Sequence, residues 1–223
     1  MKNYYAEKLN ASKLFQVYQT DIPRVKQYLE AEVARVARDL AGQEIVLELG
    51  AGYGRILKAL APFARNITGV EISSDSVLFG KEYLKGVSNC SLVITDAFKL
   101  KYETEFDVVL CLQNGLSAIK GEPMDLVNVA LRSLVPGGRV YFSTYSAAFW
   151  DQRLARFMEQ AGKGLLGEID MGLTKDGQIV CKDGFVARTF SHRDLENIGH
   201  KSRCQYHIEE VDGSSLFLIL KKG

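Results

Sequence analysis

Within residues 45–55, a run of apolar residues comes directly before three glycines at alternate positions, Gly50, Gly52 and Gly54. An amphipathic run follows from residue 56 to residue 63. This order predicts a buried strand, a tight glycine loop and a helix. Such a loop brings backbone N–H groups and the positive end of a helix to the carboxyl end of the strand, where a nucleotide-like ligand can bind. Glycine-rich turns also occur for steric reasons alone, so the rest of the chain must decide between the two interpretations.

The middle of the chain alternates between expected strands and expected helices. The strands cover residues 45–49, 66–71, 90–95, 106–112 and 139–144, and the helices between them cover residues 55–64, 74–85 and 124–134. Elements that alternate at this spacing form right-handed βαβ units in a parallel sheet. The strands are continuously apolar, which fits burial on both faces of that sheet.

The segment before the first strand is expected to be helical over residues 3–40. Asp21 is expected to cap a helix that has Pro23 in its first turn, because aspartate is a favoured N-cap and proline a favoured first-turn residue. Gly42 fits just past the end of this helix. We expect the segment to cover the ligand site as a lid.

The segment after the fifth strand has a different pattern. A helix is expected over residues 147–161. Short strands are then expected over residues 167–173, 178–181 and 185–189, separated by Asp-Gly turns. Ser191 is expected to cap a short helix that ends at Gly199, and a hairpin from 205 to 220 closes the chain. The fold class is therefore α/β: a doubly wound, mostly parallel sheet that ends in an antiparallel hairpin, with a β-insertion after strand five.

We expect a single domain over residues 1–223. Its parts are the N-terminal helical lid (1–42), the ligand-binding core (43–146), the helix with the β-insertion (147–190) and the closing helix with its hairpin (191–223).

The amino-acid composition limits the classes of molecule that the chain is expected to bind. The 28 basic and 27 acidic residues give a net charge of +1, which favours neither nucleic acid nor an anionic membrane. No apolar run nears the ~20 residues that span a bilayer, and the first residues lack the apolar region of a secretory signal. The four cysteines are scattered without metal-ligand spacing: Cys90, Cys111, Cys181 and Cys204. We expect a cytoplasmic protein, a monomer or homodimer, with no metal.

Glu71 ends the second expected strand, 17 residues after Gly54, where a carboxylate can accept hydrogen bonds from a ribose diol. A dinucleotide-binding loop needs a third Gly or Ala where this chain has Arg55, which disfavours a nicotinamide cofactor. The segment Glu48-Leu49-Gly50-Ala51-Gly52-Tyr53-Gly54 instead resembles the first motif of the class I S-adenosylmethionine-dependent methyltransferases, particularly the small-molecule group often called type 11. The resemblance covers residues 44–145 and continues through the closing hairpin.

The resemblance implies S-adenosyl-L-methionine as the cofactor and assigns roles around it. By family analogy Glu48 helps to hold the amino group, Glu71 binds the ribose, Asp96 binds the adenine amine, and Gln113 and Asn114 lie beside the sulfonium. The implied cofactor-binding residues are Tyr18, Arg24, Glu48, Gly50, Ala51, Gly52, Gly54, Glu71, Ile72, Asp96, Ala97, Phe98, Leu112, Gln113 and Asn114.

The acceptor is expected to be a small molecule. The sequence Gln113-Asn114-Gly115-Leu116 lacks the Asn/Asp-Pro-Pro-aromatic motif that nucleic-acid amino-methyltransferases carry. Tyr5, Tyr145 and Arg188 are candidate substrate residues, and no catalytic residue is identified. Two alternatives stay open: a catalytically silent cofactor-binding protein that regulates a partner, and a nicotinamide-dependent oxidoreductase.

Overall fold

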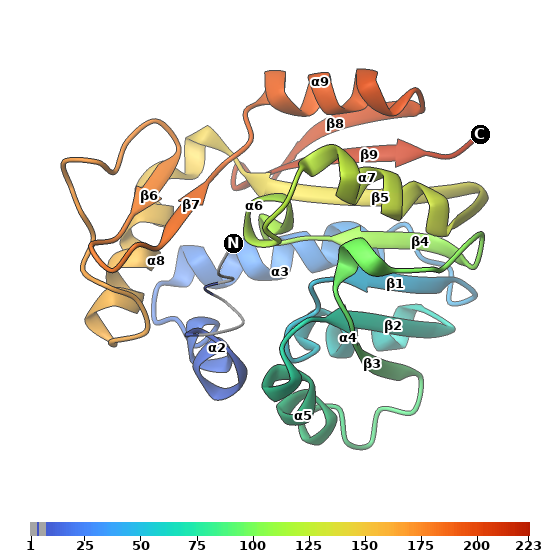
Figure 1. Cartoon of the computed structure of the whole chain (residues 1–223), viewed down its shortest axis with the longest axis horizontal. Helices are drawn as coiled ribbons and strands as arrows, with labels where there is room; N and C mark the ends of the chain where they lie inside the picture. The colour runs from blue at the N-terminus through green and yellow to red at the C-terminus, as the bar shows by residue number, and fades with distance from the viewer. Residues whose placement is uncertain (1–3, 5–7) are drawn as a thin grey trace.

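A seven-stranded sheet forms the centre of the molecule in the computed structural model, which describes residues 4 and 8–223. The strands follow the order β3-β2-β1-β4-β5-β9-β8 (Figure 1). Their bounds are β1 (Ile45–Leu49), β2 (Asn66–Glu71), β3 (Cys90–Ile94), β4 (Phe106–Cys111), β5 (Leu134–Tyr145), β8 (Gln205–Val211) and β9 (Ser215–Lys221). Strands β1 to β5 pair in parallel, and β9 pairs antiparallel with both β5 and β8. The expected fold class is confirmed.

Helices cover both faces of the sheet. The α-helices are α2 (Ala11–Val17), α3 (Pro23–Ala37), α4 (Arg55–Leu60), α5 (Ser74–Tyr83), α6 (Gly115–Ala118), α7 (Pro123–Ser133), α8 (Trp150–Gly162) and α9 (His192–Ser202). Short 3-10 turns are η1 (Ala61–Phe63), η2 (Ala97–Lys99) and η3 (Ala147–Phe149). One apolar core holds residues of α7 and α9, and a second holds residues of α3 and α4.

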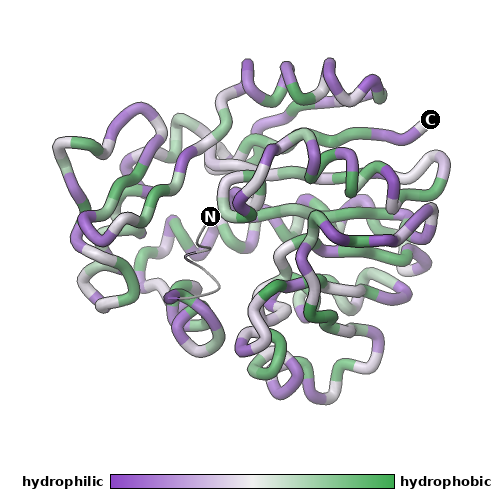
Figure 2. Tube along the Cα trace, in the orientation of Figure 1, coloured by the Kyte–Doolittle hydropathy of each residue, from purple (hydrophilic) through white to green (hydrophobic). Residues whose placement is uncertain are grey.

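Strand β4 shows why the central strands are mostly apolar. Val109 contributes to the core under α7 and α9, whereas Val108 and Leu110 contribute to the core under α3 and α4. Successive side chains of a strand point to opposite faces, so a strand covered on both faces needs apolar residues at every position. Figure 2 shows the hydrophobic colour running along these strands and the hydrophilic colour recurring on the helices.

The β-insertion is a two-stranded antiparallel sheet of β6 (Gln178–Val180) and β7 (Val186–Arg188). Ile179 and Phe185 form a third core cluster with Phe157 of α8 and with Leu9. In Figure 1 the insertion, α2 and α8 lie beyond the carboxyl end of β5, which is the edge of the sheet where ligands bind in folds of this type.

The N-terminal segment forms two separate helices, α2 and α3. The prediction that Asp21 caps α3 is wrong: the N-cap is Ile22, which makes no side-chain cap. The backbone N–H of Asp21 donates to Glu159 at 2.8 Å instead. Pro23 does occupy the first turn, as expected, because proline lacks the N–H that such a cap would have to satisfy.

In the C-terminal part the predicted hairpin is confirmed, whereas some of the predicted element boundaries differ from those observed. Ser191 caps α9 in a reciprocal capping box with Asp194, as expected. The prediction that Gly199 ends α9 is wrong, since the helix continues to Ser202 and Gly199 allows the close approach of the Tyr206 ring. Residues 167–173 form no strand and contribute one bridge, Ile169 to Cys181. Strand β5 begins earlier than expected and includes the Pro-Gly-Gly segment, next to a register shift against β4.

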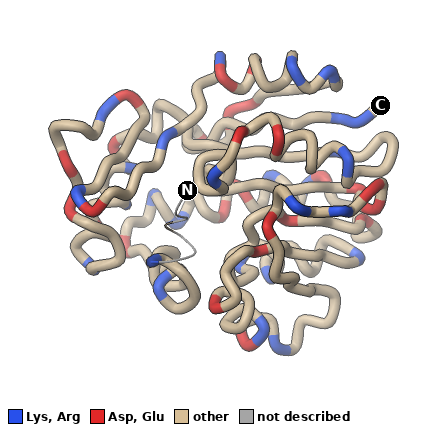
Figure 3. The backbone as a smooth tube through the Cα atoms, viewed as in Figure 1, with Lys and Arg blue, Asp and Glu red and all other residues tan. Residues whose placement is uncertain are grey.

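Charged residues are interspersed along the trace and gather into no single-sign stripe (Figure 3). Within residues 4 and 8–223, no helix combines the length and the hydropathy that crossing a bilayer requires. Within the same residues, no group of three or more His, Cys, Asp or Glu side chains is arranged to hold a metal ion.

Candidate functional site

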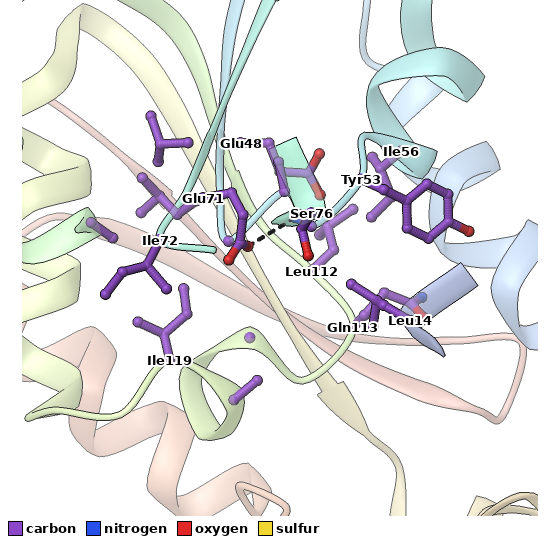
Figure 4. A pocket seen from close by; sticks show the side chains of 18 of the residues that line it. Leu14, Glu48, Tyr53, Ile56, Glu71, Ile72, Ser76, Leu112, Gln113 and Ile119 are labelled. Carbon is purple, nitrogen blue, oxygen red and sulfur yellow. Dashed lines mark hydrogen bonds between the residues drawn. The ribbon is translucent and has the colours of Figure 1, made fainter. Parts of the chain in front are cut away.

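A cavity of about 360 Å³ lies at the carboxyl ends of β1 to β4. It contains most of the residues that the motifs predicted for a cofactor. Those that line it are Tyr18, Glu48, Gly50, Ala51, Gly52, Glu71, Ile72, Asp96, Ala97, Phe98, Leu112 and Gln113. In Figure 4, Ile72 and Ile119 lie toward one end of the cavity and Gln113 and Leu14 toward the other, with Glu71 and Glu48 between them.

The glycine loop forms one wall of this cavity. The backbone N–H groups of Gly50 and Ala51 both donate to the carbonyl of Val70, at 2.9 and 3.0 Å, so the loop is tied to the end of β2. Gly52 has a φ of +55°, and a Cβ there would lie 2.7 Å from the Leu14 side chain. The left-handed backbone and the close approach of α2 together account for glycine at this position.

The Glu71 carboxylate is fixed at the rim of the cavity by two backbone donors. One oxygen accepts from Gly52 N–H at 3.0 Å and the other from Ser73 N–H at 2.8 Å. Burial raises the pKa of Glu71, and these hydrogen bonds act in the opposite direction. Each carboxylate oxygen has a further lone pair, so Glu71 can also accept from a ligand hydroxyl.

Glu48 is buried against the same cavity, with 4% of its surface exposed. Burial raises its pKa to about 8, an effect that nearby Arg55 opposes and Glu71 reinforces. Its Oε2 atom has no hydrogen-bond partner. A buried carboxylate oxygen without a partner is costly, and a ligand ammonium that donates to it would remove that cost.

Asp96 follows β3 and lines the far end of the cavity. Its Oδ1 accepts from the backbone N–H of Phe98 at 3.0 Å, which caps η2 and holds Ala97 and Phe98 against the cavity. The arrangement leaves the other carboxylate oxygen available to accept a hydrogen bond from a flat, amine-bearing ring beside Phe98.

Gln113 and Asn114 both have left-handed backbones, with φ of +56° and +62°. Gln113 N–H donates to Ser143 Oγ at 2.8 Å, and Asn114 N–H donates to the Ser143 carbonyl at 3.1 Å. The Asn114 side chain donates to the Arg188 carbonyl at 2.9 Å and accepts from Thr144 Oγ1 at 2.8 Å. Left-handed residues of this kind are held by their surroundings and cluster at functional sites.

Residues 46–138 match the model of a protein family described as a methyltransferase domain. This part of the chain is similar to the class I S-adenosylmethionine-dependent methyltransferases. Curated relatives include the ubiquinone biosynthesis O-methyltransferase of Hydrogenovibrio crunogenus, 25% identical over 115 residues (50% of this chain, 47% of the relative). The enzyme of the same name from Thiobacillus denitrificans is 31% identical over 108 residues (47% and 45%). The chain thus spans about half the length of these relatives.

Solved structures share the fold over the whole chain. The PH0226 protein from Pyrococcus horikoshii OT3 has a TM-score of 0.67 at 21% identity and covers 100% of both chains. A complex described as DhpI-SAH has a TM-score of 0.67 at 18% identity, covering 99% of this chain and 94% of the other. These similarities establish the methyltransferase fold beyond the matched domain, including the N-terminal helices and the closing hairpin.

Three residues that the methyltransferase motifs predicted for the cofactor lie outside the cavity lining. Arg24 donates to Asp212 at 2.5 Å, and its guanidinium lies 5.0 Å from the Phe149 ring centroid. Gly54, with φ of +85°, is the N-cap of α4. Asn114 is buried one residue before Gly115, which does line the cavity.

Two candidate substrate residues, Tyr145 and Arg188, do not line this cavity. Tyr145 stacks on Tyr28 at 5.1 Å and accepts from Arg156 at 3.0 Å, away from the cavity lining. Arg188 lies over the Phe190 ring at 4.5 Å. Tyr5 lies outside the described residues.

The sequence reasoning missed several lining residues. They include Leu14, Arg55, Ser76, Thr95, Ile119 and Lys120. Ile119 and Lys120 follow α6, a single helical turn that no periodic pattern marks. Leu14 lies on α2 and reaches the glycine loop across the fold, a contact that neither segment signals on its own.

Proposed function

We propose that this chain transfers the methyl group of S-adenosylmethionine to a small-molecule acceptor. The observation that carries the proposal is the Glu71 carboxylate, which two backbone N–H groups hold beside the glycine loop at the rim of the cavity. A ribose diol at this place would donate to a fixed pair of charged acceptor oxygens. Such hydrogen bonds are charge-assisted and therefore stronger than neutral ones.

The residues present fit the cofactor from end to end. Asp96 and Phe98 would hold the adenine, Glu71 the ribose, and the unpartnered Oε2 of Glu48 the ammonium of the amino-acid tail. Leu14 of α2 and Tyr18 line the cavity together with the residues of the sheet, which supports the proposed role of the N-terminal segment as a lid.

When bound, S-adenosylmethionine supplies an activated methyl group, which an acceptor atom takes in line as the carbon–sulfur bond breaks. The protein's part is to hold the two partners at that geometry and to exclude water. Orientation of this kind can be worth about 7–11 kcal/mol of the barrier, so a strongly basic residue is not always needed. Leu14, Leu112 and Ile119 give the cavity an apolar part to its lining, which would leave water there few hydrogen-bond partners.

Calorimetric titration with S-adenosylhomocysteine tests cofactor binding directly. We expect a single site, and no heat of binding at millimolar ligand would contradict the proposal. A matched titration with NAD separates the nicotinamide alternative, because a dinucleotide-binding protein would prefer NAD.

A methyl-transfer screen tests the reaction. The curated relatives are named O-methyltransferases, so we propose hydroxyl compounds as the first acceptors to try, followed by amines, carboxylates and thiols. Transfer of labelled methyl to one class supports an enzyme with that specificity. Cofactor binding without transfer to any class would instead favour a catalytically silent, cofactor-binding protein.

A further inference from the structure

A buried carboxylate on α3 reaches the turn that follows β4. Glu32 is fully buried and accepts a hydrogen bond from Ser215 Oγ of β9 at 2.7 Å. Its other oxygen accepts from the backbone N–H of Gln113 at 3.2 Å and also from the side-chain amide Nε2 of Gln113. No sequence motif includes Glu32. Among the described residues, Glu32 is one of the few charged side chains with no exposed surface.

These contacts fix the orientation of the Gln113 amide. Because the NH2 group donates to Glu32, the amide oxygen Oε1 must face the opposite way. Gln113 lines the cavity, and its Oε1 is buried without a hydrogen-bond partner. A buried acceptor left without a partner carries a desolvation cost that a ligand donor can remove.

The order of the strands tells which part of a ligand reaches Gln113. Asp96 follows β3, Glu71 ends β2, Glu48 lies on β1 and Gln113 follows β4, and these strands are neighbours in that order. Figure 4 shows the same progression, with Ile72 at one end, Glu71 and Glu48 in the middle and Gln113 at the other end. An elongated cofactor with its ribose at Glu71 therefore places its amino-acid tail between β1 and β4.

Two residues that line this part of the cavity each have a buried oxygen without a hydrogen-bond partner, Glu48 Oε2 and Gln113 Oε1. We propose that Glu32 is a positioning residue that holds Gln113 Oε1 as a hydrogen-bond acceptor for the ammonium of the bound cofactor. An ammonium has three donors, so Glu48 and Gln113 can both accept from it. This inference rests on the proposed function, because it takes S-adenosylmethionine as the ligand.

The test compares two ligands that differ in the tail. S-adenosylhomocysteine carries the ammonium, whereas 5′-methylthioadenosine has the same adenosine and no amino acid. Hydrogen bonds to charged groups are worth enough to change affinity about tenfold or more. We expect Gln113→Leu and Glu32→Leu each to weaken S-adenosylhomocysteine about tenfold and to leave 5′-methylthioadenosine within about twofold of the wild type.

Glu32→Gln is the matched control. Its amide oxygen can keep accepting from Gln113, while its NH2 group donates to Ser215 Oγ, which accepts as readily as it donates. We therefore expect Glu32→Gln to keep nearly wild-type affinity for both ligands. Gln113→Leu changes a residue at the cavity wall without altering Glu32, so it tests the acceptor role even if Glu32→Leu folds poorly.

The outcomes separate the two proposals. Equal weakening of both ligands would show a general structural role for Glu32 and overturn the inference, as would unchanged affinity of Gln113→Leu for S-adenosylhomocysteine. Both results leave the proposed function standing, because the wild type still binds. A wild type that binds neither ligand would overturn the proposed function and this inference with it.

Discussion

The Glu71 carboxylate accepts a hydrogen bond from the backbone N–H of Gly52 at 3.0 Å, so one side chain fixes the end of β2 to the glycine loop. The same carboxylate accepts from Ser73 N–H at 2.8 Å, at the N-cap of α5. Three segments that surround the cavity therefore share one half-buried acid. Its position is set before any ligand binds, which lowers the cost of ordering the site.

Replacing Glu71 tests this arrangement. We expect Glu71→Ala to weaken S-adenosylhomocysteine at least tenfold, because the ribose loses its charged acceptor and two backbone donors lose theirs. Calorimetry measures the affinity. Glu71→Gln keeps one acceptor oxygen, so its affinity for S-adenosylhomocysteine should lie between those of the wild type and of Glu71→Ala. An unchanged affinity in Glu71→Ala would contradict the assignment of Glu71 to the ribose.

Two helical glycines give a matched test of packing. A Cβ on Gly80 of α5 would lie 2.4 Å from Leu92 Cδ1 and 2.9 Å from the Tyr53 carbonyl oxygen, whereas a Cβ on Gly162 of α8 would meet nothing within 4 Å. Gly80→Ala should lower the free energy of unfolding by about 1–3 kcal/mol. Gly162→Ala should raise it by about 0.5–1 kcal/mol, since alanine favours helix.

Urea denaturation followed by circular dichroism measures both changes. Both substitutions are Gly→Ala at helical positions, but Gly80 lies inside α5 and Gly162 is the last residue of α8, so helix propensity cancels only in part. Equal stability of the two variants would show that α5 can move away from the Tyr53 carbonyl at little cost, against the close packing described above.

Arg24 tests a motif role that the geometry does not support. The family resemblance places an arginine of this segment on the cofactor carboxylate, but Arg24 pairs with Asp212 at 2.5 Å. We expect Arg24→Ala to leave the affinity for S-adenosylhomocysteine within about twofold of the wild type. A double-mutant cycle with Asp212→Ala should give a coupling of about 0.2–1 kcal/mol, typical of a partly exposed pair. A tenfold loss of affinity would restore the motif role.

The cofactor end of the site could be predicted because its signals are local. Gly50 and Gly52 need left-handed backbones, and the loop follows a strand whose apolar character is continuous. Glu71 sits at the end of the next strand, so its position follows from the βαβ connection alone. The strand order of the sheet core then brings these residues together without further information.

The other end could not be predicted because its contacts join distant segments. Glu32 and Gln113 are 81 positions apart, and Glu32 and Ser215 are 183 apart. No local pattern distinguishes Glu32 from the solvated acids of an amphipathic helix, and burial is decided only when α3 packs on the sheet. The same holds for Arg24, whose partner Asp212 lies in the turn of the closing hairpin.

The protonation state of Glu48 is expected to change when the cofactor binds. Burial raises its pKa to about 8, against an ordinary value of 4.5, so the folded protein without ligand keeps this carboxyl protonated where the unfolded chain has lost the proton. Between pH 4.5 and about pH 8 the folded state therefore binds more protons than the unfolded state. The contribution of Glu48 to stability accordingly falls as the pH rises through this window.

A ligand ammonium beside Glu48 favours the ionised carboxylate and reverses the effect of burial. We expect S-adenosylhomocysteine to bind more tightly as the pH rises from about 6 to about 8, with release of a proton at pH 7. Calorimetry in buffers of different ionisation enthalpy measures that proton directly. Glu48→Gln, which cannot ionise, should bind without proton release and with little pH dependence. Proton release that persists in Glu48→Gln would assign the titrating group elsewhere and remove Glu48 from the ammonium site.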